Sequence, residues 1–187
     1  NSLPGNIIFF LPGAGEMKDT RALLEKSLNL SKYRIVNLSS ASREEEKNVA
    51  LGEEGYTSHD LGLERIIILS TNVAEASLTP KNLSYVIDSG RERSSIYVPE
   101  FYSTSLDIKF ITKANVKQRK GRVGRTSDGY VYFMYTRKEY DEMENFLVPN
   151  IVKSDITGTV LDLLTMKNTD DYNKLYSFLG ELVDRPS

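Results

Sequence analysis

Five short runs of apolar residues constrain the fold of this 187-residue chain more than any other feature. They cover residues 7–11, 34–38, 66–69, 83–87 and 130–135. Each run is continuous rather than alternating, as is typical of strands covered on both faces in a parallel sheet. Between the first two runs, Leu23, Leu24 and Leu28 recur at helical spacing, and the interval is close to the roughly 30 residues of a strand-helix-strand unit. The pattern predicts an α/β fold with a parallel sheet flanked by helices.

Local signals predict how the remaining segments fold. Ser42 followed by Glu45 is a capping-box pattern, which predicts a second helix through about Leu51. Residues 94–98 and 104–111 are rich in β-branched and aromatic residues, so we expect an antiparallel hairpin between the fourth and fifth strands. Further helices are predicted after residue 137, over 154–166 and over 171–182, with Pro149 marking a boundary.

Composition places the chain among ordinary globular proteins. Apolar residues make up 40% and charged residues 27%, and the length suits one compact domain. No apolar run approaches the roughly 18 residues of a membrane span, and no signal-peptide pattern is present. With no cysteine there is neither a disulfide framework nor a thiolate metal site. We therefore expect an intracellular protein, cytoplasmic or nuclear, with no membrane partner and no metal ligands of its own.

The distribution of charge matters more than its total. A net charge of −2 and a pI near 5.6 would by themselves argue against a nucleic-acid partner. Residues 108–125, however, contain no acid and seven basic side chains. Such a strip fits a phosphate-facing surface, although an uneven, solvated surface would look the same in the sequence.

The octapeptide 118–125, Gln-Arg-Lys-Gly-Arg-Val-Gly-Arg, is the densest part of this strip. If it is helical, Gln118, Arg122 and Arg125 are at positions i, i+4 and i+7 and share one face. Guanidinium groups suit the charge that develops on a transferring phosphoryl group. Gly121 and Gly124 each cost a helix roughly 1 kcal/mol relative to alanine, which indicates a close backbone approach. The alternative interpretation is a basic surface helix that happens to contain two glycines.

Four segments in order resemble the motifs of a known family. They are residues 10–13 with Glu16 (motif IV), 70–79 (motif V), 86–90, and 118–125 (motif VI). In these segments the chain resembles the second RecA-like domain of a superfamily 2 nucleic-acid helicase of the DEAH/DExH group. A weaker match, residues 149–152 with the apolar run through Leu164, is similar to the segment that leads toward this family's winged helix.

The resemblance implies a division of the chain and a missing partner. Residues 1–147 would form the motor domain, with the hairpin inserted at about 94–111, and residues 148–187 a helical connector toward a winged-helix domain. ATP or another NTP, with Mg²⁺, would be bound mainly by a first RecA-like domain of the same polypeptide. The chain itself contains no G-x-x-x-x-G-K-[ST] loop and no DEAH-like acidic motif. We therefore expect this chain alone to be a monomer without NTP hydrolysis.

The resemblance also assigns roles to individual residues. Arg122 and Arg125 would be arginine fingers on the γ-phosphate, and Gln118 would position the attacking water or the phosphate. The residues expected to line the nucleotide are Ser77, Thr79 and Gly121. The residues expected to hold the nucleic-acid backbone are Gly13, Ser39, Thr71 and Asn72. Arg119 is expected to be structural, paired with an acid inside the domain.

Several alternatives remain open at this level. The hairpin of the family would wedge between nucleic-acid strands, but a hairpin that only shields the sheet edge is also possible. RNA is favoured over DNA as the single-stranded or duplex partner by the habits of the group, although phosphate contacts do not distinguish the two. A nucleic-acid-binding scaffold that has lost its chemistry is the second hypothesis. The presence of Gln118, Arg122 and Arg125 favours the motor, because a scaffold has no need of paired arginine fingers.

The chain departs from the family pattern at two positions near the nucleotide. Ala50 stands where the family has a phenylalanine that stacks on the base, and Lys81 where it has an aspartate near the ribose. Alanine offers no aromatic face and lysine no acceptor. Tyr56, in the following loop, could replace the lost stack.

Overall fold

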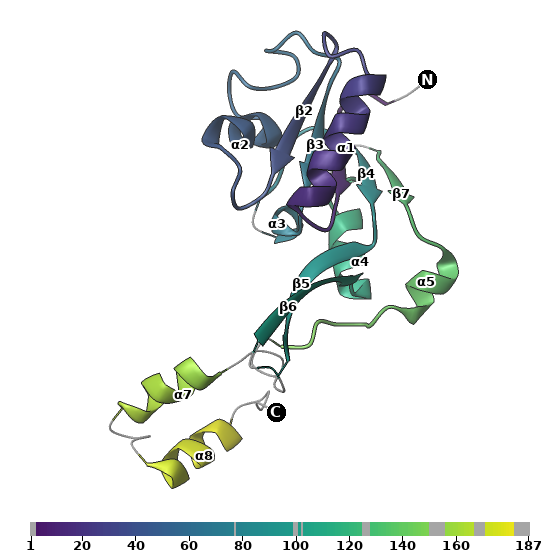
Figure 1. Ribbon diagram of the computed structural model, residues 1–187. Helices are drawn as coiled ribbons and strands as arrows, with labels where there is room; N and C mark the ends of the chain where they lie inside the picture. Colours follow the sequence, from purple (N-terminus) through teal and green to yellow (C-terminus); the bar gives the residue numbers. More distant parts are fainter. Residues whose placement is uncertain are drawn as a thin grey trace. The chain divides into compact units, whose positions relative to one another are not determined.

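The computed structural model describes residues 3–76, 78–98, 101, 103–124, 128–149, 156–166 and 171–181. Its main feature is a five-stranded sheet in the order β2-β3-β1-β4-β7, in which every neighbouring pair is parallel (Figure 1). The strands are β1 (Asn6–Phe10), β2 (Tyr33–Leu38), β3 (Arg65–Ser70), β4 (Leu83–Asp88) and β7 (Tyr130–Phe133). All five predicted strands and the parallel arrangement are confirmed.

Helices cover both faces of the sheet because the strands are apolar on both. Ile8 and Phe10 of β1 belong to one buried cluster, whereas Ile7 and Phe9 pack against another, as alternation along a strand requires. Helix α1 (Ala14–Ser27) contributes Met17 to the second cluster, and α2 (Glu44–Leu51) contributes residues to the first. Figure 1 shows α1 lying across the strands. The core is thus divided by the sheet into two layers.

The predicted helix at 44–51 is present, but its predicted cap is wrong. Arg43 is the N-cap residue of α2 and makes no capping hydrogen bond through its side chain. The Ser42 hydroxyl instead donates to the Asn37 carbonyl, at 2.9 Å, and accepts from the Ser39 amide, also at 2.9 Å. Backbone groups of the preceding turn, three and five residues away, therefore bind the hydroxyl that the capping-box pattern assigned to the helix. Three glutamates in the first turn still suit the positive end of the helix dipole.

The remaining elements connect and extend this core. They are α3 (Val73–Ala76), β5 (Arg91–Val98), β6 (Ser103–Phe110), α4 (Lys113–Lys120), α5 (Arg137–Glu142), α7 (Thr157–Leu164) and α8 (Tyr172–Gly180). Strands β5 and β6 form the predicted antiparallel hairpin, a two-stranded sheet of their own. Helix α4 begins with a capping box between Thr112 and Asn115.

The chain forms two compact units. The first comprises residues 1–93 and 108–146, and the second residues 94–107 and 147–187. The second unit contains α7 and α8, which match the two C-terminal helices predicted from the sequence. In the part of the chain that the structure describes, no helix has both the length and the apolar character needed to cross a membrane.

Candidate functional site

The residues predicted to hold a nucleic-acid backbone follow the carboxyl ends of three adjacent strands. Gly13 follows β1, Ser39 follows β2, and Thr71 and Asn72 follow β3. Because Leu38 and Phe10 are both in register with Ser70, these strands end at the same level of the sheet. The structure therefore brings the four residues to one edge. In open parallel sheets this is the edge at which ligands bind.

The polar groups at this edge differ in their availability. The buried Ser70 hydroxyl ties the strand ends together by donating to the Leu38 carbonyl, at 3.1 Å, and to the Thr71 carbonyl, at 2.9 Å. The Ser39 amide and hydroxyl are both engaged by Ser42. Asn72 is exposed and Thr71 is half-buried, and neither side chain is hydrogen-bonded by another described residue. Thr71 and Asn72 are thus the donors most ready for a ligand.

Gly13 is less accessible than expected from the sequence. It is buried, and a Cβ atom at this position would lie 2.9 Å from Nε of Arg93 and 3.2 Å from Oε2 of Glu16. Arg93 donates to Glu16 Oε1 at 3.0 Å, so this ion pair covers the glycine. A ligand that approaches the Gly13 backbone must first displace the pair, and it would then meet the Arg93 guanidinium.

A buried ionic network lies between this edge and motif VI. Arg119 is completely buried, with Nε 2.6 Å from Glu75 Oε1 and Nη1 2.7 Å from Asp88 Oδ1. Its guanidinium also lies 4.9 Å from the centre of the Phe10 ring. The prediction that Arg119 pairs with an internal acid is confirmed, with two acids rather than one. The identity of both partners was missed, although Glu75 lies in motif V and Asp88 in the segment 86–90.

Two further side chains complete the network. Asn115 donates to the second carboxylate oxygen of Glu75, at 2.6 Å, and the Tyr135 hydroxyl donates to the second oxygen of Asp88, at 3.1 Å. All four carboxylate oxygens are therefore bonded, which buried charges require. Burial, reinforced by the Asp88 carboxylate, raises the pKa of Tyr135 well above its ordinary value. The Tyr135 hydroxyl is therefore protonated at neutral pH and donates its hydrogen bond to Asp88.

The helical interpretation of the octapeptide is wrong beyond residue 120. Helix α4 ends at Lys120, Gly121 is its C-cap, and Gly124 has a φ of 75°, a left-handed conformation that favours glycine. Gln118 is exposed on α4, but Arg122 lies in the turn that follows, so the two do not share a helix face. A Cβ atom at Gly121 would lie 3.2 Å from the Lys117 carbonyl oxygen. Gly121 thus ends the helix and Gly124 lies in the loop that follows, while the role of Gly121 beside the nucleotide stays a prediction.

The structure nevertheless brings Arg122 to motif V. Its Nη1 donates to the Thr79 hydroxyl at 3.4 Å, and its Nη2 donates to the backbone carbonyl of Glu75. The half-buried Arg122 therefore contacts one of the predicted nucleotide-side residues and the residue whose carboxylate binds Arg119. The predictions for Arg125 and Ser77 fall outside the described residues.

A cavity of about 600 Å³ adjoins this contact. Thr79, Lys81 and Arg122 line it. The Lys81 ammonium lies 3.6 Å from Glu53, whereas Ala50 is only 1% exposed and belongs to the core. Tyr56 packs against the same core cluster. The cavity lining therefore offers cationic groups and hydroxyls, and neither Ala50 nor Lys81 presents an aromatic face to it.

Comparison with known proteins identifies the family. Residues 1–127 match the model of the helicase conserved C-terminal domain. The chain is 35% identical to the DExH-box ATP-dependent RNA helicase DExH6 of Arabidopsis thaliana, covering 100% of this chain and 14% of the relative. It is 31% identical to the ATP-dependent RNA helicase DHX30 of Rattus norvegicus, covering 98% of this chain and 15% of the relative. The chain thus spans about one seventh of the length of these two relatives.

A solved structure shows the same fold. The DEAH/RHA helicase HrpB of Escherichia coli superposes with a TM-score of 0.77 at 25% identity, covering 98% of this chain and 25% of the solved chain. The four motifs, the parallel sheet and these similarities lead to one conclusion. The chain belongs to the helicase conserved C-terminal domain family, as the second RecA-like domain of a superfamily 2 helicase of the DEAH/DExH group.

Proposed function

We propose that this chain is the C-terminal motor domain of an NTP-dependent DExH-type RNA helicase. It would form one wall of an NTP site between two motor domains and would grip single-stranded RNA at the carboxyl edge of its sheet. The observation that carries this proposal is the course of motif V. Thr71 lies at the strand-end edge, Thr79 contacts Arg122, and Glu75 between them is fixed to Arg119. One short segment thus joins the two faces that a motor must couple.

On the nucleotide face, Arg122 would change partners during the reaction. It now donates to a hydroxyl and a backbone carbonyl, both neutral acceptors. The oxygens of a γ-phosphate are charged and form stronger bonds with a guanidinium, so they would compete for Arg122 when the domains close. Arg125 and Gln118 would assist in the roles inferred from the family resemblance. The guanidinium would then stabilise the charge that develops as the phosphoryl group leaves.

The donors described on this wall suit phosphate oxygens rather than a metal ion. Arg122, Lys81 and Thr79 are cationic or hydroxylic, whereas Mg²⁺ prefers carboxylate, phosphate and water oxygens. A bound Mg²⁺–NTP complex would supply the transferable phosphoryl group, with its metal held from the first motor domain. The contribution of this chain would be to orient the γ-phosphate and to exclude bulk water, other than the attacking molecule, as the cleft closes.

On the RNA face, the contacts would not depend on base identity. The Thr71 hydroxyl and the Asn72 amide can donate to phosphate oxygens, which gives a grip without sequence preference. If the ion pair between Arg93 and Glu16 opened, the backbone near Gly13 would become accessible as a further contact for the RNA. Domain closure on NTP and release after hydrolysis would then move this grip along one strand.

The first test uses the chain alone. We expect the purified 187-residue chain to show no measurable hydrolysis of ATP, because the phosphate loop is absent from its sequence. Joined to a first motor domain, it should support RNA-stimulated hydrolysis. Hydrolysis that copurifies with the isolated chain and is lost in Arg122→Ala would belong to the chain itself, and it would contradict the proposal that this chain supplies only one wall.

The hairpin is proposed to act as a wedge that separates strands. Replacing residues 95–108 with a short Gly-Ser turn in the complete helicase should spare RNA-stimulated hydrolysis and abolish duplex unwinding, since a wedge acts after the chemical step. Strand displacement and phosphate release measure the two activities separately. A hairpin that only shields the sheet would behave differently: its removal would lower the melting temperature and reduce both activities together.

Nucleobase selectivity is expected to be weak. Ala50 is buried and Lys81 is paired with Glu53, so this wall retains little that could read a base or a ribose. The complete helicase should hydrolyse ATP, GTP, CTP and UTP within about tenfold of one another, corresponding to roughly 1.4 kcal/mol of discrimination. Rates with the four nucleotides decide the point. A preference for ATP above about a hundredfold would mean that Tyr56 or the first motor domain reads the base.

A further inference from the structure

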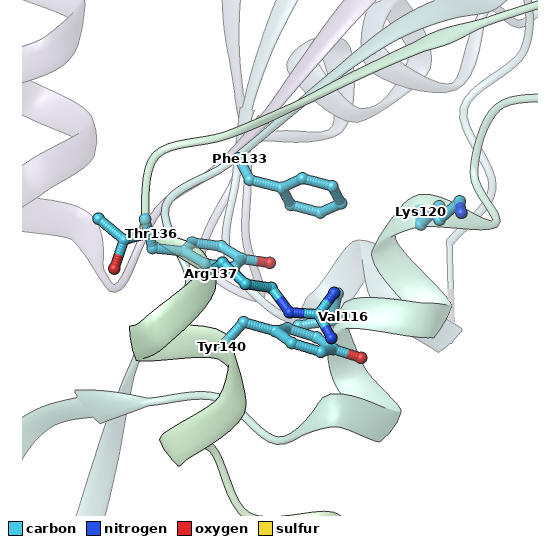
Figure 2. A pocket seen from close by; sticks show the side chains of 7 residues that line it. Val116, Lys120, Phe133, Thr136, Arg137 and Tyr140 are labelled. Carbon is cyan, nitrogen blue, oxygen red and sulfur yellow. The ribbon is translucent and has the colours of Figure 1, made fainter.

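A second cavity, of about 360 Å³, lies within the first unit between α4, β7 and α5 (Figure 2). Its lining includes Val116, Lys120, Phe133, Tyr135, Arg137 and Tyr140. None of these residues belongs to the proposed NTP wall, which consists of Thr79, Lys81 and Arg122, or to the strand-end donors, Thr71 and Asn72. The volume is at the low end of the range of about 300–1,000 Å³ that is typical of small-molecule pockets.

The cavity combines ring faces with cations. The rings of Phe133 and Tyr135 lie 5.3 Å apart, and Phe133 is 44% exposed. Figure 2 shows Phe133 on one side of the space, with Arg137 and Tyr140 together on the other. The Arg137 guanidinium lies 5.3 Å from the centre of the Tyr140 ring, a cation–π geometry. Lys120, the last residue of α4, lies at the rim of this space.

The positive charge of this cavity is only partly compensated. Arg137 is paired with Asp141 through Nε, at 3.1 Å, and no other described residue bonds its terminal nitrogens. Lys120 has no ion-pair partner among the described residues. The nearby Glu139 is already engaged by the amide and hydroxyl of Thr136, which lower the pKa of its carboxyl group. The cations thus remain available to an anion.

The position of the cavity relates it to the strand-end donors. Phe133 is in register with Asp88, Asp88 with Phe10, and Phe10 with Ser70, the residue before Thr71. Phe133 is therefore level with Ser70 at the same sheet edge, one residue short of Thr71. Strands β3 and β7 are three places apart in the sheet, or roughly 14 Å at about 4.8 Å per strand. A strand held by Thr71 reaches this distance within a few nucleotides.

We propose that the cavity holds one nucleotide of single-stranded RNA, with the base against the aromatic rings and a phosphate between Lys120 and Arg137. This inference rests on the proposed function, because it extends the same RNA path along the carboxyl edge. A nucleotide joins a planar π face to an anion, and the cavity offers a partner for each. An acidic peptide would match the cations but would leave the ring faces without a planar partner.

The test is RNA binding by the chain, with matched variants on both sides of β7. Phe133→Leu removes the ring, and Arg137→Gln removes the charge. Tyr132→Leu is the control for the first, since Tyr132 is similarly exposed and alternation along β7 directs it to the opposite face. Lys138→Gln is the control for the second, because Lys138 is highly exposed and adjacent in sequence. Fluorescence anisotropy with a uridine-rich RNA, and photo-crosslinking with its 4-thiouridine analogue, give the affinity and the contact.

Phe133→Leu and Arg137→Gln should each weaken RNA binding by about fivefold or more. A loss of affinity of about fivefold is the smallest effect expected when one base loses its stacking partner. The controls should remain within about twofold of the wild type, and crosslinks should map to the peptides that contain Phe133 and Tyr140. Thr71→Ala provides the reference for the strand-end contact. Circular dichroism verifies that each variant is folded.

The other outcomes are distinguishable. If Thr71→Ala weakens binding but the cavity variants do not, the cavity proposal is wrong and the proposed function stands. If the wild type does not bind RNA, both fail. If free UMP binds at the cavity but the cavity variants do not change the affinity for RNA, the cavity is a site for a free mononucleotide. Loss of poly-glutamate binding in the same variants, with RNA affinity intact, would assign it to an acidic protein; either result would overturn the proposal.

Discussion

Arg122→Ala is expected to lower the rate of NTP hydrolysis by about 10³-fold or more in a helicase that contains this chain and its first motor domain. The reason is the loss of the guanidinium that would stabilise charge on the transferring phosphoryl group. RNA affinity should stay nearly unchanged, because Arg122 contacts Thr79 and the Glu75 carbonyl rather than the strand-end edge. Single-turnover hydrolysis with saturating RNA measures the chemical step. Arg125→Ala is expected to have the same effect.

Arg122→Lys is the informative control. It keeps the positive charge but loses the planar arrangement of donors that can bind two oxygens at once. We expect it to recover only part of the lost rate. Full activity in the lysine variant would mean that a positive charge alone is sufficient, and an unchanged rate in the alanine variant would remove Arg122 from the catalytic role.

Arg119→Met is expected to cause the largest loss of stability. The substitution keeps much of the side-chain volume but leaves the carboxylates of Glu75 and Asp88 buried without their cation. Breaking a buried ion pair on one side costs about 3–5 kcal/mol, a large part of the total stability of a domain. For a chain of this size the melting temperature should fall by roughly 6–20 °C, at about 2–4 °C per kcal/mol. Thermal unfolding followed by circular dichroism measures the shift.

Two comparisons separate charge burial from a general loss of packing. Arg34→Met breaks a surface pair with Glu45 and should cost no more than about 1 kcal/mol. Adding Glu75→Gln and Asp88→Asn to Arg119→Met should restore part of the stability, because the unpaired charges are then gone. If Arg119→Met costs no more than Arg34→Met, or if the triple variant is less stable still, the buried charges are not what the arginine stabilises.

The elements that were predicted correctly depend on local patterns. The five strands follow from continuous apolar runs, and the hairpin from β-branched and aromatic segments, because each pattern reflects burial along one segment. The motif order identified the family without any knowledge of tertiary contacts. Thr71 and Asn72 were assigned from the family resemblance, and the register of β1, β2 and β3 is what brings them to one edge with Gly13 and Ser39.

The errors arose where tertiary geometry competes with a local pattern. The prediction of one helix face from Gln118 to Arg125 did not allow for the conformational freedom of the glycine backbone. The helix ends at Lys120, and the chain turns at Gly121 and Gly124. Arg119 is buried as expected, but the two acids that bind it and the bond from Arg122 to motif V depend on tertiary contacts that the sequence does not show. These contacts join residues that are separated by 44 and by 47 positions in the sequence, and helix or strand periodicity predicts nothing about contacts over such separations.

The cavity beside β7 was also missed, for a related reason. Its residues come from α4, β7 and α5, and none of these segments carries a motif for it. Tyr135 and Tyr140 belong to patterns that predict only a strand and a helix. The cavity forms where Tyr135 bonds Asp88 while Phe133 and Arg137 remain exposed, and these positions depend on the assembled sheet edge.

The central claim is that motif V couples two separate faces, and one measurement tests it most directly. NTP hydrolysis by the complete helicase is followed as a function of RNA concentration for the wild type, Thr71→Ala and Arg122→Ala. We predict that Thr71→Ala raises the RNA concentration needed for half-maximal stimulation and that Arg122→Ala lowers the maximal rate without changing that concentration. If Arg122→Ala shifts only the RNA concentration dependence, or Thr71→Ala lowers only the maximal rate, the assignment of the two faces is contradicted.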